Sequence, residues 1–516
     1  MFTGPLVGAQ LSVSTAQPCT DYDLRATTGS TTASEPTARL ARRRLAPHQP
    51  PSMEIQFYGA AREVTGSCHV VRVLGKTILL DFGLFQGRRA DVRQKNESVP
   101  LAVHEIDAVV LSHAHIDHAG RLPFLVRSGF SGAIHATPAT RDLCEVMLAD
   151  SAHIQEQDAA FLARRNKTVA QPLYAQRDVV RTMELMRPTP YQKAVEIVPG
   201  VRATFVDAGH ILGSSSVVLD WNEGSTNRRL AFSGDIGRAG LAIIGDPEPP
   251  VSVSAIIMES TYGNRDHASV DDAKERLASV VRDTAARGGR VLVPAFAVGR
   301  TQELVYDLHE LSAAGRIPGV PIVIDSPLAS RATDVFTRNT DVFDGREAFV
   351  RAHTGRRREL FEFPLLRFTQ SIEESKALNQ QAGPLVIIAA SGMAESGRIL
   401  HHLLYGASDP RNTILVVGFM AEHTLGRRIV ERQPTLKVLG EDVELKARVE
   451  VINGYSAHAD RRGLLDWAES VRGTSPALRD IYLVHGEPAA QDAFCAMLGE
   501  RGMRGHTPAA GTRVLI

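Results

Sequence analysis

The stretch Ser-His-Ala-His-Ile-Asp-His-Ala-Gly at residues 112–120 places three histidines and one aspartate within six positions. It follows an apolar run at 106–111 that predicts a buried strand, and it precedes residues 122–126, which predict the start of a helix. We therefore expect these polar side chains on a turn that leaves a strand, where a rigid scaffold presents them to a cleft. Imidazole and carboxylate groups bind zinc and similar divalent ions. The alternative is a histidine-rich polar loop that binds no metal.

One short motif cannot fill the coordination shells of two ions. His113 and His115 can reach one ion, while the adjacent Asp117 and His118 point elsewhere and can serve a second. Further candidates lie where a predicted strand meets a glycine-containing turn: Asp81, His210, Asp235 and His485. Each alone is equally well explained as a polar residue that ends a strand, but their joint occurrence favours metal binding. Two ions about 3.5–4 Å apart can promote phosphodiester hydrolysis. Acyl hydrolysis is the alternative reaction, and residue chemistry alone leaves that choice open.

Composition sets limits on the class of protein. The chain has 516 residues, enough for two or three domains. Its 43% hydrophobic and 22% charged residues are typical of a soluble globular protein. Lys+Arg and Asp+Glu both number 58, so net charge provides no bulk attraction to nucleic acid or to an anionic membrane. A polyanionic substrate would have to be attracted by a local groove and by bound metal.

Cysteine usage and hydropathy bear on location. The four cysteines are widely spaced and form no C-x-x-C motif, which argues against a disulfide framework and against a cysteine zinc site. No apolar stretch approaches the length of a membrane span. We therefore expect a cytoplasmic protein without a membrane partner.

The rhythm of predicted elements changes along the chain. Short strands dominate residues 54–262, with helices near 138–164 and 175–187, and they predict a two-sheet sandwich with helices packed outside. Strands and helices alternate over 263–450, which predicts a parallel sheet in a second domain. For residues 451–516 we expect a return to short strands.

The ordered motifs resemble those of the metallo-β-lactamase superfamily. The metal-ligand candidates form one part of the match, and Glu259-Ser-Thr-Tyr-Gly, Tyr-Ser-Ala-His458-Ala-Asp and Leu-Val-His485-Gly-Glu resemble its β-CASP branch, which contains RNA nucleases. The resemblance covers about residues 54–516. It implies an α/β fold, in which an αββα sandwich carries an inserted, parallel-sheet α/β domain. Residues 451–516 would then return to the sandwich.

The resemblance also implies two zinc ions per chain, with manganese as the alternative metal. It assigns the ions to two ligand groups: His113, His115 and His210 for one, and Asp117, His118 and His485 for the other. Asp235 would bridge the two ions.

Four residues are implied to serve catalysis. Asp81 would orient the ligands and the bound water, and Asp117 would take part as a ligand of the second ion. Glu259 and His458 would pair near the scissile phosphate, with the histidine protonating the leaving oxygen, because a neighbouring carboxylate favours the imidazolium.

Phosphate contacts are expected from three glycine-containing loops. A turn that opens a helix can bind phosphate through backbone N–H groups, and arginine adds charge. The residues predicted to contact RNA are Ser67, Arg300, Ser391, Gly392, Ser396, Gly397 and Arg398. The alternative is that these are ordinary turns.

Residues 1–52 are rich in Ser, Thr, Ala and Pro and are expected to be disordered. Met53, directly before the first predicted strand, is the alternative chain start. A further alternative is a flexible arm whose Arg42, Arg43 and Arg44 contact RNA.

The resemblance thus implies a zinc-dependent ribonuclease that acts on RNA, expected to be single-stranded, by endonuclease or 5′-exonuclease cleavage, in RNA processing or decay. The alternatives are a DNA nuclease of the same branch, a small-molecule metallo-hydrolase and an inactive RNA-binding scaffold. Small-molecule hydrolases lack the inserted domain, and inactive relatives typically lack metal ligands. The sequence leaves the oligomeric state open between a monomer and a homodimer.

Overall fold

The computed structural model describes residues 53–87, 89–166, 171–343, 360–418, 420 and 423–516. The expected disordered tail at 1–52 lies outside the described residues. Among the helices that the structure describes, none combines the length and apolar content needed to cross a bilayer.

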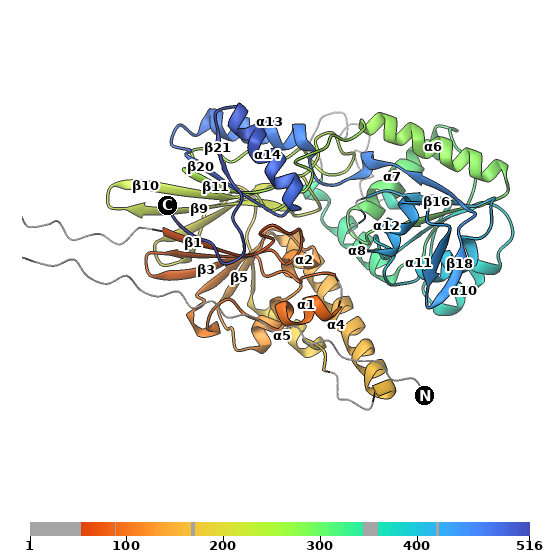
Figure 1. Ribbon diagram of the computed structural model, residues 1–516, viewed down its shortest axis with the longest axis horizontal. Helices are drawn as coiled ribbons and strands as arrows, with labels where there is room; N and C mark the ends of the chain where they lie inside the picture. The colour runs from red at the N-terminus through yellow and green to blue at the C-terminus, as the bar shows by residue number, and fades with distance from the viewer. Residues whose placement is uncertain (1–52, 88, 167–170, 344–359, 419, 421–422) are drawn as a thin grey trace, which may run out of the picture. The chain divides into compact units, whose positions relative to one another are not determined.

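Two seven-stranded sheets form the first part of the fold (Figure 1). In spatial order, the first sheet contains β22 (Arg513–Leu515), β1 (Met53–Gly59), β2 (Cys68–Val73), β3 (Lys76–Leu80), β4 (Ala108–Val110), β5 (Ala133–Ala136) and β6 (Met186–Pro188). The second contains β21 (Arg504–His506), β20 (Asp480–Val484), β11 (Ala255–Glu259), β10 (Thr226–Phe232), β9 (Ser215–Glu223), β8 (Val201–Asp207) and β7 (Val195–Val198). Both sheets are mixed: their strands pair antiparallel at one end and parallel at the other.

The two sheets bury a common apolar layer. Alternate residues of β1, including Ile55 and Phe57, point inward and pack in one cluster with Phe205, Trp221 and Phe232 of the second sheet. Burying one such side chain contributes about 1.5–3 kcal/mol. This period-two pattern is why the short, alternating runs of the sequence fold as facing strands.

Helices cover the two outer faces. Their bounds are α1 (Arg89–Asn96), α2 (Ile116–Ala119), α3 (Leu122–Arg127), α4 (Pro138–Asn166), α5 (Gln176–Leu185), α13 (Arg461–Thr474) and α14 (Pro488–Glu500). Side chains of α3, α4 and α5 pack against the first sheet, and those of α13 and α14 against the second. Figure 1 shows α4 and α5 on the side of the first sheet and α13 and α14 on the side of the second. The expected αββα sandwich is confirmed.

The inserted domain is built on a six-stranded, all-parallel sheet. Its strands, in spatial order, are β14 (Leu366–Phe368), β13 (Ile322–Ile324), β15 (Leu385–Ala389), β12 (Arg290–Pro294), β16 (Thr413–Val416) and β19 (Arg448–Val451). A separate antiparallel hairpin, β17 (Thr435–Val438) and β18 (Glu441–Glu444), lies between β16 and β19 in sequence. Its helices are α6 (Val270–Ala286), α7 (Arg300–Ala313), α8 (Pro327–Arg338), α10 (Ile372–Gln380), α11 (Ile399–Gly406) and α12 (Leu425–Val430).

The insertion is visible in one strand pair. β11 and β20 are parallel neighbours in the second sheet, with Glu259 opposite Val484, although the whole inserted sheet lies between them in sequence. The chain therefore leaves the sandwich after β11 and returns to it before β20. The expected insertion and parallel sheet are confirmed, while the boundaries at 262/263 and 450/451 stay predictions.

The expectation of short strands for residues 451–516 is wrong in part. Strands β20, β21 and β22 are present, but α13 and α14 span 14 and 13 residues. Leu464, Ala468 and Val471 recur at helical spacing and are buried. The Asp460 side chain accepts a hydrogen bond from the Gly463 N–H and caps α13.

Candidate metal centre

Strand order brings the predicted ligands to one edge of the sandwich. Asp81 and Ser112 follow the parallel strands β3 and β4, so they leave the first sheet side by side. Asp235 follows β10 of the second sheet. His485 follows β20, which is separated from β10 only by β11. The carboxyl ends of neighbouring parallel strands meet at a common edge, which explains why residues far apart in sequence converge.

A glycine allows the motif helix to approach the first sheet. Asp117 and His118 lie on the short helix α2, directly after His115. A Cβ atom at Gly83 would lie 1.5 Å from the Asp117 carbonyl oxygen. Only glycine fits at position 83, and the close approach places α2 at the strand ends.

The first ligand group consists of three imidazoles. His113 Nε2 lies 3.1 Å from His115 Nδ1, which in turn lies 3.2 Å from His210 Nε2. Zinc binds histidine nitrogen at about 2.0–2.1 Å with tetrahedral geometry, which places two ligand atoms about 3.3 Å apart. These three nitrogens therefore have the spacing that one ion requires.

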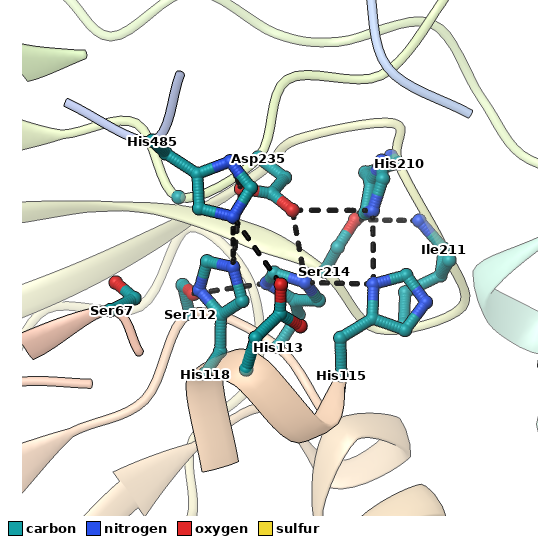
Figure 2. Close-up of polar contacts among 12 residues, drawn as sticks. Ser67, Ser112, His113, His115, His118, His210, Ile211, Ser214, Asp235 and His485 are labelled. Atoms are coloured by element: carbon teal, nitrogen blue, oxygen red, sulfur yellow. Dashed lines mark hydrogen bonds and ion pairs between the residues drawn. The ribbon is translucent and has the colours of Figure 1, made fainter. Parts of the chain in front are cut away.

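The second group lies beside it. His118 Nε2 is 3.1 Å from His485 Nε2, and the latter is 3.5 Å from Asp117 Oδ2. Figure 2 shows the rings of His118 and His485 facing each other on one side of Asp235, with His115 and His210 on the other side.

Asp235 faces both groups with different oxygens. Its Oδ2 lies 3.4 Å from His113 Nε2 and 3.5 Å from His210 Nε2. Its Oδ1 lies 3.3 Å from His118 Nε2 and 3.6 Å from His485 Nδ1. Burial alone would raise the pKa of Asp235, but the facing imidazoles, His118 first, hold it well below its usual range. The carboxylate is therefore ionised.

The donor set fits bound cations. Asp235 Oδ1 is buried and has no hydrogen-bond partner among the residues that the structure describes. A buried ionised carboxylate oxygen that accepts no hydrogen bond is costly, and a cation between it and the facing imidazoles removes that cost. Histidine nitrogen and carboxylate oxygen are zinc ligands, and manganese also accepts carboxylates.

Hydrogen bonds fix which nitrogen the His113 and His118 rings present. Asp81 Oδ2 lies 2.7 Å from His118 Nδ1 and accepts from the Ser112 hydroxyl at 3.0 Å. Because that hydroxyl donates to Asp81, its oxygen accepts from His113 Nδ1, 3.0 Å away. His118 and His113 are thus left with free Nε2 atoms at the centre, as metal-ligating histidines require.

Thr261 has the same function for His485. Its hydroxyl donates to the His485 carbonyl and lies 3.0 Å from His485 Nδ1. Nδ1–H therefore donates to Thr261, and Nε2 faces His118. Ser112 and Thr261 carry no predicted role from the sequence, although both lie within the motifs quoted there.

Glu259 and His458 form a buried pair. Their side chains lie 3.0 Å apart, His458 Nδ1 to Glu259 Oε1, and His458 Nε2 lies 3.9 Å from Asp235 Oδ2. A backbone bridge between Gly237 and His458 holds the late motif beside the turn that carries Asp235. Burial alone would lower the pKa of His458, but Glu259 and Asp235 raise it to about 9.

A pocket of about 400 Å³ opens at the centre. Its lining joins two kinds of residue. One part consists of site residues: His115, Asp117, His210, Asp235, His458 and His485. The other part includes Phe296, Val298, Arg300 and Met393 of the inserted domain. Arg300, predicted to contact RNA, thus reaches the pocket.

Ser67 takes a different position from the one that a phosphate contact needs. It is buried, and its hydroxyl donates to Asp81 Oδ2 at 3.0 Å. Its backbone N–H donates to the Asp117 carbonyl. This geometry favours a role in holding Asp81 and α2 over the predicted contact with phosphate.

The loop before α11 is largely closed on itself. The Ser391 hydroxyl accepts hydrogen bonds from the N–H groups of Glu395 and Ser396. The Ile399 N–H donates to the Ala390 carbonyl and closes the loop at its other end. Arg398 Nη1 donates to Asp325 Oδ1 at 2.7 Å. Phosphate binding by Ser391, Gly392, Ser396, Gly397 and Arg398 stays a prediction.

Known protein families match three consecutive stretches of the chain. Residues 61–288 match the metallo-beta-lactamase superfamily, and residues 301–429 match the Beta-Casp domain. Residues 442–508 match the Zn-dependent metallo-hydrolase RNA specificity domain. All the predicted metal ligands fall within the first and third matches.

Curated relatives cover most of the chain. A Thermus thermophilus protein named Ribonuclease TTHA0252 is 37% identical over 87% of this chain and 97% of its own length. Proteins named transcription termination factor FttA, from Methanosarcina mazei and Thermococcus kodakarensis, are 30% and 32% identical over 85% and 84% of this chain and 67% of their own lengths. A crystal structure of an Enterococcus faecalis protein of unknown function has the same fold, with a TM-score of 0.53, 11% identity and coverage of 90% of this chain and all of that one.

Proposed function

Because this chain belongs to the β-CASP family of metallo-β-lactamase hydrolases, we propose that it is a ribonuclease that hydrolyses phosphodiester bonds at a two-metal centre. The observation that carries the two-metal part is the position of Asp235, whose two oxygens face two separate groups of ligands. The names of the relatives, a ribonuclease and termination factors, support RNA as the substrate.

Different side chains of the site would bind the metal ions and orient the ligand rings around the scissile phosphate. His113, His115 and His210 would hold one ion, Asp117, His118 and His485 the other, and Asp235 both. Bound divalent ions supply Lewis-acid stabilisation of developing negative charge and make hydrolytic water available near neutral pH. Asp81, Ser112 and Thr261 keep the ligand rings in the required tautomers.

The surroundings of His458 support a role as proton donor. Its Nδ1–H donates to Glu259, whose Oε1 also accepts from the Ile236 N–H at 2.6 Å. This anchoring leaves Nε2–H directed at the centre, 3.9 Å from Asp235 Oδ2. We assign the imidazolium to protonation of the leaving oxygen, a step worth about 10²–10⁴-fold in rate. Arg300, which lines the same pocket, would hold a phosphate of the bound strand.

Zinc as the cellular metal, single-stranded RNA as the substrate and a cytoplasmic location belong to the same proposal. The two ligand groups together contain five histidines and two aspartates, and this excess of imidazole over carboxylate favours zinc. The pocket of about 400 Å³ at the centre has room for a nucleotide, which supports an unpaired strand as the substrate.

The test uses metal-loaded protein and end-labelled single-stranded RNA with either a 5′-phosphate or a 5′-hydroxyl. We expect RNA cleavage that a chelator abolishes and that Asp235→Asn reduces at least about 10²-fold, the loss typical of a key electrostatic group. Product lengths separate endonuclease from exonuclease action. Equal cleavage of a matched DNA strand would instead identify a nuclease without sugar specificity, and absence of cleavage of RNA would overturn the proposal.

A further inference from the structure

Two adjacent strands of the inserted sheet send their loops to opposite faces. β12 and β15 are parallel neighbours. After β12 the chain enters α7, whose Leu304 and Leu308 pack on the face that carries Val291. After β15 it enters α11, whose Leu403 packs on the opposite face with Ile387. Loops that diverge at adjacent carboxyl ends leave a crevice, the usual ligand position in open parallel sheets.

Phe296 lies in this crevice and is exposed. It is 39% accessible, and among the large apolar side chains that are exposed in the described part of the chain it is the only phenylalanine. A Cβ atom at Gly392 would lie 2.6 Å from Phe296 Cδ2, so the ring rests directly on glycine backbone from the β15 loop. The Thr301 hydroxyl donates to the Phe296 carbonyl at 2.8 Å and holds the loop. The ring is therefore supported on one side and open to the pocket.

The crevice is continuous with the metal centre. Phe296, Val298, Met393 and Arg300 line the same pocket as His458 and the metal ligands. Arg300 is 7% accessible, and its Nε has no hydrogen-bond partner among the described residues. The exposed ring of Phe296 thus lies in the same pocket as the buried guanidinium of Arg300, whose Nε–H is free to donate a hydrogen bond.

We propose that this crevice binds one unpaired nucleotide beside the scissile bond, with its base stacked on Phe296 and its phosphate held by Arg300. The proposal rests on the proposed ribonuclease function. Stacking on an aromatic ring tolerates every base because each has a π-face, so the subsite selects for an unpaired strand and not for a sequence. Gly392 acts indirectly: any side chain there would displace the ring.

The test first maps the main cleavage site of the wild-type protein in a fixed single-stranded RNA. Kinetics are then measured with that RNA and with versions that carry an abasic residue on either side of the site. We expect Phe296→Ala to raise KM about 10- to 100-fold, the loss typical of one base–aromatic contact. Phe296→Trp should keep KM within about threefold, whereas Phe296→Leu, which preserves bulk without a π-face, should behave like alanine.

Two controls separate stacking from a general defect. Tyr405→Ala removes another exposed aromatic, 64% accessible on α11 and absent from the pocket lining, and should leave KM unchanged. With wild-type protein, one of the two abasic RNAs should raise KM as much as Phe296→Ala does with the intact RNA. Phe296→Ala assayed with that abasic RNA should show little further increase in KM.

Equal KM for Phe296→Ala and wild type, or equal KM for both abasic RNAs and the intact strand, would overturn the subsite. The abasic arm needs only wild-type protein, so it decides even if a variant fails to fold. Absence of RNA cleavage by wild type would overturn the ribonuclease proposal itself, which is a distinguishable result.

Discussion

Asp81 Oδ2 lies 2.7 Å from His118 Nδ1, and this contact decides which nitrogen of the His118 ring faces the second ligand group. Because His118 Nδ1 carries the proton that it donates to Asp81, His118 Nε2 is left without one, 3.1 Å from His485 Nε2. Asp81 also accepts from the Ser112 N–H at 2.8 Å and from two serine hydroxyls. The buried carboxylate of Asp81 thus holds Ser67, Ser112 and His118 in fixed positions at the edge of the first sheet.

Asp81→Asn should weaken metal binding about 10- to 100-fold, the usual loss when a ligand's hydrogen-bond partner is altered. The amide has the shape of the carboxylate but adds N–H donors, which cannot accept from His118 and Ser112. Competition with a chelator of known affinity measures the change. Asp107→Asn is the matched control, because Asp107 pairs with Lys76 near the start of β4, away from the ligands. Equal affinity of the Asp81 variant and the control would contradict the orienting role.

His458→Ala should slow RNA cleavage by about 10²-fold or more, because the leaving oxygen then departs without a proton donor. With bis(p-nitrophenyl) phosphate, whose leaving group needs no proton, the loss should be under about tenfold. Glu259→Gln should show the same substrate-dependent pattern, since it acts through His458. Comparing kcat on the two substrates makes the measurement. An equal loss on both, together with loss of bound metal, would indicate that His458 is a ligand instead.

Much of the fold could be predicted because local signals were strong. The expected alternation of helix and strand over 263–450 begins with α6 and β12, where Ser269 caps the helix and Gly288-Gly289 separates it from the next apolar run. Asp81, Asp235 and His485, three of the predicted site residues, share a similarly clear signal, a polar residue between an apolar run and a nearby glycine.

Other features depend on tertiary contacts that no local pattern encodes. Ser112 and Thr261 gain their roles only when strands distant in sequence meet. Ser67 is oriented by Asp81 into the interior, and Arg398 by Asp325 into an ion pair. A glycine-rich turn looks the same in sequence whether its donors face solvent or each other.

Asp325→Asn should destabilise the inserted domain. Asp325 is fully buried and accepts from His402, Ser375, Thr369 and Arg398. Burial alone would raise the pKa of Asp325, but these hydrogen bonds, His402 first, hold it well below its usual range. Breaking such a buried pair costs about 3–5 kcal/mol. Thermal unfolding at pH 7 should therefore show a clear fall in Tm with metal content unchanged.

The depressed pKa of Asp325 also predicts how its contribution to the free energy of unfolding changes with pH. Because its folded pKa is depressed, its contribution to stability is present above the unfolded pKa of about 3.9 and is lost as pH falls toward the folded pKa. The difference between wild type and Asp325→Asn should hold from pH 7 to pH 5 and shrink below pH 4, by about 1.4 kcal/mol per pH unit. Asp409→Asn, which removes a surface pair with Arg411, should change stability by under about 1 kcal/mol. A gap that widens at low pH would contradict the assignment.

The central claim is that Asp235 joins two metal sites, and the metal content of the purified protein tests it most directly. Elemental analysis of the zinc-loaded wild type should give close to two ions per chain, and Asp235→Asn, whose amide supplies no negative charge between the two ligand groups, should give clearly fewer. A wild-type protein without bound metal, or a variant that retains two ions at wild-type affinity, would contradict the account.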